Sequence, residues 1–542
     1  MAGLGKPDGH PGPPPAQSLA AAPLSSRTEA LSILTAAVVG ALCVYAMRRV
    51  DPDLYGYLAY GRLFVEQGRI AVEDPFAYTS TGSTWVAFEW LAQLALWIAY
   101  DTAGPLGLIG LKCLLGGIAA YFVYDAVRLV SGRDFHWLPV FCFAVANFSR
   151  YFVFRPQLFT FAFFALFVAV LLRHLMRRRA PLWALPIVML VWVNTHGGFV
   201  AGLGAIGLVV ALRIGENASG GARGLALLQG TRVLWLAFGA CMAVTLLNPR
   251  GVDLWRYVLT ELTHSTNRQY IGEWGPSHTS GDMWSFAASI VTCLCLALGG
   301  WISEWRRPSS PGPVPGHLVL SAVPLAVMAF ESVRHTPILA IWSAPVLALT
   351  ASQVRVSMLG ANRVLSMGLL TAALTSLLMT MLSVAGNPRP AIAATGNVLG
   401  PQHPCQAVGF MRQTKLAGNV YLPLHWGSYV TWHLYPAVRV SMDGRNISLF
   451  PRDMVRESLE YSTSSHPDLE TPLRYDTDFL LVRSNFSRLD ALEADTRWTE
   501  IHRDSDAVLF RRVDGRARPP AASSGRAAAE SIPAEACPAF LQ

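Results

Sequence analysis

The segment QLFTFAFFALFVAVLLRHLM, residues 157–176, is predominantly apolar and is followed at once by three arginines, Arg177, Arg178 and Arg179. An α-helix that crosses the hydrocarbon core of a bilayer needs about 20 mostly apolar residues. Clusters of lysine and arginine are typical of the cytoplasmic ends of such helices. We therefore predict that residues 157–176 form a membrane-spanning helix whose C-terminal end lies in the cytoplasm.

The composition of the whole chain agrees with this prediction. Hydrophobic residues make up 52% of the 542 residues and charged residues only 14%, against roughly 25% charged residues in a typical soluble domain. The mean hydropathy is +0.35. The net charge of +8 comes from short basic clusters between apolar stretches, without the basic stripe and interleaved aromatic residues of a nucleic-acid surface. We therefore expect membrane lipids around the chain and no nucleic acid as a partner. A divalent metal ion is possible, but nothing in the sequence supports one.

Eleven stretches in all have the length and apolar character of spans. With Arg177–Arg179 in the cytoplasm, the N-terminus and Arg306-Arg307 are also cytoplasmic, and everything after residue 385 lies outside. Besides 157–176, the candidate spans are 30–49, 105–127, 136–154, 181–196, 198–214, 231–248, 283–302, 317–333, 336–351 and 364–385.

A twelfth apolar stretch, residues 85–100, is ambiguous. Counting it as a span would place Arg177–Arg179 outside, against the charge rule. Either 85–100 lies along the outer interface as an amphipathic helix, or 136–154, which contains Asn147 and Arg150, is re-entrant. We favour the first alternative, because a charge buried without a partner in a bilayer is costly.

The predicted fold class is mainly α, a polytopic transmembrane helical bundle with a small C-terminal α/β domain outside the membrane. Residues 1–28 and 515–542 are low in complexity and predicted to be disordered, 29–386 form the membrane domain with a first outer loop at 50–104, and 387–514 form the outer α/β domain. Cys405 and Cys537 are able to pair if this region is oxidised. The predicted strands of this domain are Val420–Leu422, Val438–Met442, Phe479–Val482 and a hairpin over Trp498–Arg511 that turns at Asp504-Ser505-Asp506.

The first outer loop opens with Asp51-Pro52-Asp53. Asp51 followed by proline is typical of a helix N-cap with proline at the first helical position. Asp53 would then stand in the first turn and share a face with Tyr57 and Tyr60. A carboxylate beside aromatic rings suits sugar binding and general-base chemistry, so Asp53 is the leading functional candidate.

Other polar residues on the predicted outer side have both a structural and a functional interpretation. Asp74, before a proline, starts a turn or belongs to the site. Glu89, in an apolar stretch, is a functional candidate by its depth or reaches the interface by snorkelling. Arg155 anchors two helices at the interface or binds a lipid phosphate through its guanidinium fork. Asn194 and His196 form a structural network or line a site.

The later outer segments extend this cluster. Glu273 lies in the loop after residue 249, and Arg334-His335 separates two short spans. A second cationic pair on the outer side would suit a phosphate or pyrophosphate leaving group. Asp443-Gly444-Arg445 in the outer domain follows a predicted strand, which is the pattern of a plain turn.

Several motifs of soluble enzymes are absent from the sequence: no Walker motif, no G-x-G-x-x-G after a strand, no G-x-S-x-G and no H-E-x-x-H. Metal-type Cys/His spacing is also absent. The sequence thus disfavours ATP-driven transport, and we predict no cofactor and no metal ligands.

One N-terminal span, an acidic motif at the start of the first outer loop, about ten further spans and a trailing outer domain together resemble the GT-C glycosyltransferases. Bacterial relatives of protein O-mannosyltransferases are the most similar group, and the likeness covers most of residues 30–385. The motifs that carry it are Asp51-Pro52-Asp53, Phe88-Glu89-Trp90-Leu91, Arg155-Pro156-Gln157, Trp192–Gly198 and Glu273-Trp274, with Trp426-Gly427-Ser428-Tyr429 and Asp443-Gly444-Arg445 in the tail domain.

The resemblance implies an inverting hexosyl- or pentosyltransferase of the bacterial inner membrane. Its donor would be a polyprenyl-phosphate-linked sugar, and its acceptor a glycan, a lipid or a protein on the extracytoplasmic side. Carried onto this chain, Asp53 matches the base of the family and Asp51 is second. This chain has Asp-Pro-Asp where an Asp-Glu pair would be a clearer match, and a second acidic motif in a later outer loop is not evident. Tyr57, Asp74, Glu89, Arg155, Asn194, His196, Glu273, Arg334 and His335 are the predicted substrate-binding residues.

Two other classes of function are compatible with the sequence. A secondary transporter or lipid flippase would favour ionisable residues at the bilayer midplane, whereas here the charges lie mainly at the outer ends of the spans. A non-catalytic membrane scaffold with a partner-binding tail domain is the other alternative.

Overall fold

The computed structural model describes most of the region between residues 51 and 513. The predicted spans 30–49, 283–302 and 364–385, the predicted tails 1–28 and 515–542, and Glu273 lie outside the described residues. The described residues are 51–131 without 86, 140–263 without 142, 143, 146, 149, 150 and 177, 316–354, 391–392, 398–399, 403–445 and 449–513.

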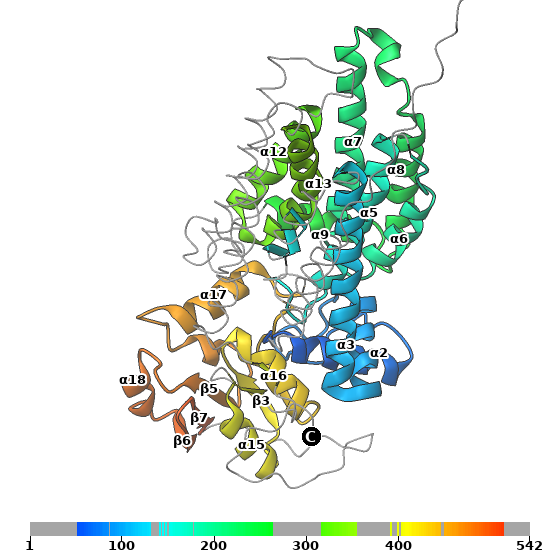
Figure 1. The fold of residues 1–542 in the computed structure, drawn as a ribbon. Helices are drawn as coiled ribbons and strands as arrows, with labels where there is room; N and C mark the ends of the chain where they lie inside the picture. The colour runs from blue at the N-terminus through cyan, green and yellow to red at the C-terminus, as the bar shows by residue number, and fades with distance from the viewer. Residues whose placement is uncertain are drawn as a thin grey trace, which may run out of the picture. The chain divides into compact units, whose positions relative to one another are not determined.

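Helices dominate the part of the chain up to residue 354 (Figure 1). Three of the described helices are long and apolar enough to cross a bilayer: α3 (Trp90–Ser131), α5 (Gln157–Leu175) and α7. The predicted span 157–176 thus corresponds to α5 within one residue. Helix α7 comprises Phe199–Ser219, and the remaining described helices of this part are α2 (Leu54–Gln67), α6 (Ala184–Val193), η1 (Gly224–Leu228), α8 (Arg232–Thr245), α9 (Val252–Thr263), α12 (Gly316–Glu331), η3 (Val333–His335) and α13 (Thr336–Val354).

Several predicted spans form helices shorter than a bilayer requires. Residues 181–196 contain α6, which has ten residues, and 231–248 contain α8, which has fourteen. The expected total of about eleven spans therefore stays a prediction. Helix α5 packs against α3, α7 and α13, so the predicted spans do form a bundle of contacting helices.

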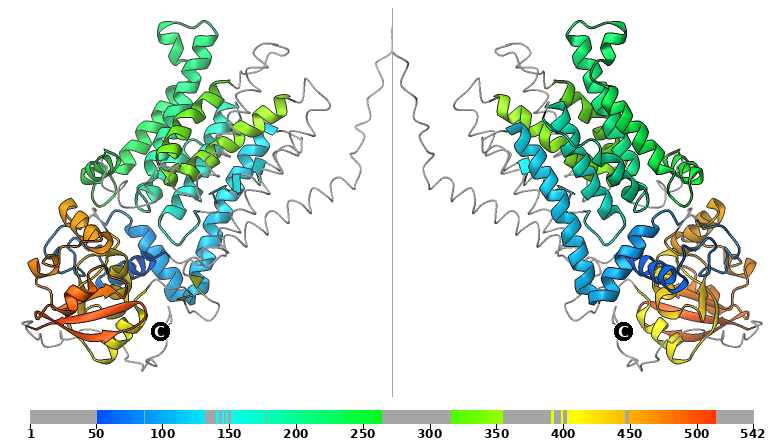
Figure 2. Two further views of the ribbon diagram at one scale, coloured as in Figure 1. Left: turned by 90° about the vertical axis from the view of Figure 1, so that its left-hand side faces the viewer. Right: turned by 90° about the vertical axis from the view of Figure 1, so that its right-hand side faces the viewer.

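Helix α3 combines the ambiguous stretch 85–100 with the predicted span 105–127 and bends between them (Figure 2). Ala103 and Gly104 have non-helical backbone angles, and Pro105 follows them. Proline disfavours the helical conformation of the residue before it, which explains the bend at this point. The first arm packs on α2, and its Trp97 contacts Trp432 of the tail domain at 6.0 Å between ring centroids. Whether 85–100 crosses the membrane stays a prediction.

Helix α2 begins later than predicted. Asp53, not Asp51, is the residue at the N-cap, and its side chain makes no capping hydrogen bond. Asp51 instead closes the preceding turn: its carbonyl oxygen accepts the N–H of Leu54 at 3.0 Å, and its carboxylate accepts the N–H of Asp53 at 3.0 Å. The carboxylate of Asp53 is therefore not used to start the helix.

The C-terminal region forms the predicted small α/β domain around a five-stranded sheet of order β4-β3-β5-β7-β6. Strand β3 pairs in parallel with β4 and β5, whereas β5-β7 and β7-β6 are antiparallel. The predicted strands and hairpin agree with these elements. Cys405 is disulfide-bonded, and Cys537 lies outside the described residues. The elements are β1 (Ala391–Ile392), β2 (Val398–Leu399), α15 (Cys405–Gln413), β3 (Gly418–Tyr421), α16 (Leu424–Leu434), β4 (Val438–Val440), α17 (Arg452–Thr463), η5 (Thr471–Arg474), β5 (Phe479–Arg483), α18 (Leu489–Glu493), β6 (Trp498–Arg503) and β7 (Ala507–Arg512).

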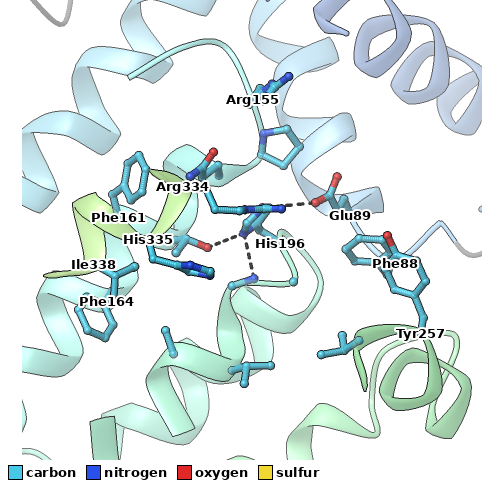
Figure 3. Close-up of a pocket in the computed structure, with 18 of the residues that line it drawn as sticks. Phe88, Glu89, Arg155, Phe161, Phe164, His196, Tyr257, Arg334, His335 and Ile338 are labelled. Carbon is cyan, nitrogen blue, oxygen red and sulfur yellow. Dashed lines mark hydrogen bonds and ion pairs between the residues drawn. The ribbon is translucent and has the colours of Figure 1, made fainter. Parts of the chain in front are cut away.

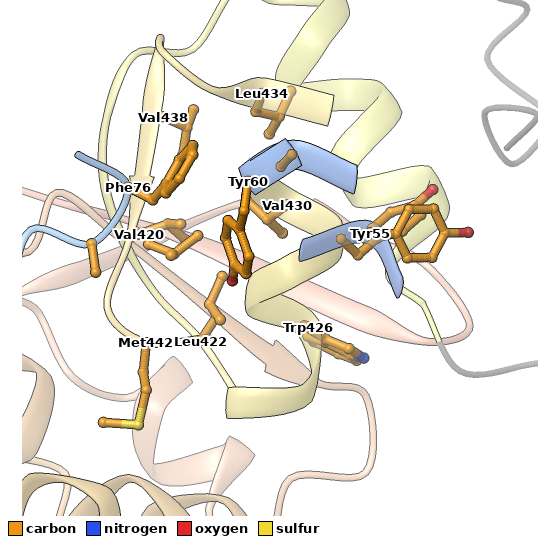
Figure 4. Close-up of a cluster of buried hydrophobic side chains, with 14 of the residues drawn as sticks. Tyr55, Tyr60, Phe76, Val420, Leu422, Trp426, Val430, Leu434, Val438 and Met442 are labelled. Atoms are coloured by element: carbon orange, nitrogen blue, oxygen red, sulfur yellow. The ribbon is translucent and has the colours of Figure 1, made fainter. Parts of the chain in front are cut away.

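The segment predicted as the first outer loop, residues 50–104, shares one hydrophobic core with this tail domain (Figure 4). Tyr60 and Phe76 of the loop are buried in the same cluster as Val430 of α16. The loop also extends the sheet, because Val440 of β4 donates its N–H to the carbonyl of Phe76 at 3.2 Å and accepts the N–H of Tyr78 at 3.0 Å. The predicted outer domain is thus completed by a segment more than 300 residues earlier in the chain.

Candidate functional site

A cavity of about 850 Å³ is lined by residues of the predicted outer loop, of the helix ends and of the tail domain. Figure 3 shows the part of its lining that comes from the loop and the helices. Seven of the predicted site residues line the cavity, although they come from five separate places in the sequence. They are Asp53, Tyr57, Glu89, Arg155, His196, Arg334 and His335. Each of these residues lies at or near a helix terminus, so helices of the bundle end around a common polar chamber.

The guanidinium of Arg155 bridges the two aspartates of the acidic motif. Its Nε lies 2.7 Å from Oδ2 of Asp51, and its Nη2 lies 3.4 Å from Oδ2 of Asp53. The side chain of Asp51 is 8% exposed and does not line the cavity, whereas that of Asp53 is 22% exposed and does. Asp51 therefore holds Arg155 without lining the cavity, and Asp53 is the carboxylate of the motif that lines the cavity.

Glu89 and His196 face each other across the cavity (Figure 3), with 3.7 Å between Glu89 Oε1 and His196 Nε2. The N–H of Gly198 donates to Nδ1 of His196 at 2.9 Å, and the hydroxyl of Thr160 lies 2.8 Å from the same nitrogen. An accepting Nδ1 leaves the proton of the neutral imidazole on Nε2, which points to Glu89.

Burial sets the protonation of this pair. Desolvation raises the pKa of Glu89 from its usual 4.5 to about 8, opposed by Arg334 and Arg155 and assisted by Asp53. Desolvation, with help from the same two arginines, lowers the pKa of His196 from its usual 6.5 to about 3. Removing either group from water disfavours its charged form. At neutral pH the pair is thus mainly uncharged, with a proton on each side chain.

The far wall of the cavity is apolar. Small and aliphatic residues of α7 and α12 form it together with aromatic rings of α5 and Ile338 of α13. Arg334 and His335 of η3, between α12 and α13, also line the cavity. The lining therefore combines a hydrophobic wall between helices with the basic side chains of Arg334 and His335. The apolar residues are Phe161, Phe164, Val200, Ala201, Ala205, Leu208, Pro324, Leu325, Met328 and Ile338.

Asp74 and Asn194 do not line the cavity. Asp74 is buried and accepts the backbone N–H groups of Phe76 and Ala77 and the hydroxyl of Ser80. The side-chain oxygen of Asn194 accepts from Trp90 Nε1 at 2.8 Å, and its amide nitrogen donates to a carbonyl of α6. Both side chains therefore bond to the chain around the cavity and are not part of its lining.

The tail domain contributes cavity residues that were absent from the predicted set. Gly444 and Arg445 follow β4, and Leu424 and His425 open α16. The sequence pattern Asp443-Gly444-Arg445 is typical of a turn, and nothing local indicates that its partner is the outer loop. Burial lowers the pKa of His425 to about 4, assisted by Arg483, whose Nη2 lies 2.5 Å from His425 Nε2.

The donor set at the acidic motif does not resemble that of a metal site. Among the described residues, no group of three or more His, Cys, Asp or Glu side chains is arranged to hold a metal ion. A positively charged guanidinium already lies between Asp51 and Asp53. These two carboxylates therefore do not fit a divalent ion while Arg155 is in this place.

No protein-family model and no curated protein match the chain, but solved structures do. The archaeal oligosaccharyltransferase AglB from Archaeoglobus fulgidus, in complex with an inhibitory peptide and a dolichol-phosphate, has a TM-score of 0.56 at 12% identity, over 85% of this chain and 70% of that chain. Arabinofuranosyltransferase AftD from Mycobacteria has a TM-score of 0.50 at 12% identity, and the match covers 90% of this chain and 41% of AftD. ArnT from Cupriavidus metallidurans in the apo state has a TM-score of 0.49 at 13% identity, and the match covers 90% of this chain and 98% of ArnT.

These similarities define the class of fold. The chain has the fold of the GT-C membrane glycosyltransferases, the superfamily that its motifs resemble. Within that class it is a helical membrane domain whose first outer loop is built into a C-terminal α/β domain.

Proposed function

We propose that this protein is a membrane glycosyltransferase that moves a sugar from a polyprenyl-phosphate donor to an acceptor hydroxyl. One observation carries the proposal: the carboxylate of Asp53 lines a cavity that also has an apolar wall between helices and the basic side chains of Arg155, Arg334 and His335. The apolar wall suits a lipid tail, the basic side chains suit a phosphate, and the carboxylate suits the hydroxyl that attacks the sugar. AglB, which has the same fold, was solved with a dolichol-phosphate.

Asp53 is the proposed general base. Its carboxylate takes the proton of the acceptor hydroxyl as the acceptor oxygen forms a bond to the anomeric carbon of the donor. The bond from that carbon to the phosphate oxygen breaks, and its electron pair leaves with the phosphate. A single displacement of this kind inverts the configuration at the anomeric carbon.

Arg155, Arg334 and His335 are proposed to bind the departing phosphate. Negative charge grows on the phosphate oxygens as the bond breaks, and cations already fixed in a cavity stabilise that charge without reorganising. Arg155 is fixed by Asp51 at 2.7 Å. Its guanidinium geometry matches phosphate oxygens, and it connects the proposed base to the proposed phosphate site.

The hydrophobic wall formed by α7, α12 and Ile338 is the proposed site of the polyprenyl chain. Gly204 and Gly207 of α7 also line this wall, where the absence of side chains leaves room for a tail. We further propose that the acceptor enters from the tail domain, where Leu424 and His425 line the cavity, on the extracytoplasmic side of the inner membrane. Transfer without a divalent metal is part of the proposal, since Arg155 supplies the positive charge between the aspartates.

The test uses the purified full-length protein in lipid nanodiscs with a panel of polyprenyl-phosphate-linked hexoses and pentoses. Asp53→Asn should lower turnover by roughly 10²- to 10⁴-fold, the usual contribution of a general base, while binding of undecaprenyl phosphate stays unchanged. Asp51→Asn is the matched control, because Asp51 lies outside the cavity, and should retain more turnover than Asp53→Asn.

Two results would overturn the proposal. Full turnover by Asp53→Asn would remove the base assignment. Failure of the wild type to bind any polyprenyl-phosphate-linked sugar would exclude the transferase, and a transporter of another lipid or a scaffold would then be the better interpretation.

A further inference from the structure

The turn formed by Asp443, Gly444 and Arg445 in the tail domain lies directly against Asp53. A Cβ atom built on Gly444 would come within 2.0 Å of Oδ1 and 2.5 Å of Cγ of Asp53. Ordinary van der Waals contacts begin at about 3.4 Å. The backbone of Gly444 does not have the positive φ that disfavours other residues, so the restriction to glycine here comes from the carboxylate of Asp53.

Helix α16 fixes the position of this turn. A Cβ atom on Gly427 would lie 2.0 Å from the carbonyl oxygen of Met442, so the helix backbone and the chain just before the turn are in close contact. On its other side α16 packs on α2, where the rings of Tyr429 and Tyr55 meet edge to face at 4.9 Å. Helix α16 therefore connects the turn to the helix whose N-cap is Asp53.

Arg445 makes the turn rigid. Its Nε and Nη2 donate to the two carboxylate oxygens of Asp443 at 2.8 and 2.7 Å, and its Nη1 donates to Asp74 of the outer loop at 2.6 Å. The guanidinium also lies 4.7 Å from the ring centroid of Trp85. Both carboxylates and the guanidinium are buried, so the turn has few ways to move relative to the outer loop.

We propose that Gly444 is a positioning residue for Asp53: the tail-domain turn restricts the carboxylate to the orientation in which it enters the cavity, in addition to the restraint from Arg155. This inference rests on the proposed function, in which Asp53 is the base. It assigns a role in the reaction to the tail domain, which supplies one wall of the space that the base occupies.

A methyl group at position 444 would displace the Asp53 carboxylate by about 1 Å or more. Misplacement of a reacting group by about 1 Å is able to lower a rate by roughly 100-fold. Gly444→Ala should therefore lower kcat by roughly that factor, with the binding of undecaprenyl phosphate unchanged. Gly409→Ala is the matched control, because Gly409 lies in the same domain and a Cβ atom built on it meets no atom within 4 Å, and it should leave kcat unchanged.

A second measurement does not depend on substrate. The midpoint of thermal unfolding is compared for Gly444→Ala in the wild-type background and in an Asp53→Ala background, where the atoms in contact with residue 444 are missing. Gly444→Ala should lower the midpoint in the first background and not in the second. Gly427→Ala, which meets backbone atoms, should lower it equally in both.

The outcomes separate this inference from the proposed function. If Asp53→Asn is inactive and Gly444→Ala has wild-type kcat, the positioning role is wrong and the proposed function stands. An equal loss of stability from Gly444→Ala in both backgrounds would also overturn it, because the contact would not be with Asp53. Should Gly444→Ala fail to fold, recovery of folding by adding Asp53→Ala supports the contact, and failure of the double variant refutes it. Full activity of Asp53→Asn overturns the proposed function itself.

Discussion

Arg445 of the tail domain donates a hydrogen bond to Asp74 of the first outer loop, with 2.6 Å between Nη1 and Oδ1, although the two residues are 371 positions apart in the chain. Their side chains are 3% and 0% exposed. Because Asp443 pairs with the same guanidinium, the arrangement is a buried cation between two carboxylates. This ion cluster joins the loop that carries Asp53 to the domain that carries Gly444.

The first prediction concerns this cluster. Arg445→Met should destabilise the protein by about 3–5 kcal/mol, because it leaves two buried carboxylates without their cation. The measurement is the free energy of unfolding in detergent. Arg503→Met is the control: Arg503 pairs with Glu493 and Glu500 on the surface of the same domain, where its side chain is 41% exposed. Water screens such exposed pairs, so this substitution should have little effect on stability. Equal effects of the two substitutions would contradict the structural role of Arg445.

The second prediction concerns the bend in α3. A Cβ atom on Gly107 would lie 1.7 Å from the carbonyl oxygen of Ala99 across the bend, whereas one on Gly110 meets nothing within 4 Å. Gly107→Ala should therefore lower the midpoint of thermal unfolding. Gly110→Ala should leave it unchanged or raise it, since alanine favours helix by up to about 1 kcal/mol. Equal midpoints for the two variants would contradict the close approach of the two arms of α3.

The helices of the membrane domain could be predicted from the sequence because their apolar stretches are long and continuous. The limits of α5, for example, agree with those expected from residues 157–176. The start of α2 was two residues off, since an aspartate before a proline forms a turn as readily as a cap, and here Asp51 closes the turn. The bend of α3 follows from Pro105, but the packing of its first arm depends on Trp432, far away in the chain.

The site could be predicted only in part. Polar residues at the predicted outer ends of the spans indicated one shared location, and Asp53, Glu89, Arg155, His196, Arg334 and His335 do line one cavity. The contribution of the tail domain could not be predicted, because Gly444 and Arg445 have the local pattern of an ordinary turn. Gly444 contacts Asp53 and Arg445 contacts Asp74, and no local sequence pattern reveals these contacts.

The third prediction concerns metal ions. Treatment of the purified protein with EDTA should leave transferase activity unchanged, because Arg155 already neutralises the charge between Asp51 and Asp53. The measurement is turnover before and after chelation, with added Mg²⁺ or Mn²⁺ as the reverse experiment. Loss of turnover with EDTA that either ion restores would show that the arginine is replaced by a metal during the reaction.

The fourth prediction concerns the pH dependence of stability. The folded protein holds the proton of Glu89 up to a pKa of about 8, whereas an unfolded chain releases it near 4.5. Between these values the folded state binds more protons, so stability falls as pH rises. His196, with its pKa lowered from 6.5 to about 3, has the opposite effect, which fades as pH rises above 6.5. His403, His425 and His433 have lowered pKa values as well, and their effects fade in the same way.

Well above pH 6.5 these histidines are neutral in both states, and among the described groups with shifted pKa values Glu89 is then the main one that still titrates. Between about pH 7.5 and 9 the midpoint of thermal unfolding should therefore fall as pH rises through the pKa of Glu89, and the fall should level off once Glu89 is ionised in both states. Glu89→Gln keeps the size of the side chain and cannot ionise, so it should abolish this fall. A slope that persists in Glu89→Gln would assign the pH dependence to another group. The conclusion that Glu89 is protonated where it faces His196 at 3.7 Å would then be wrong.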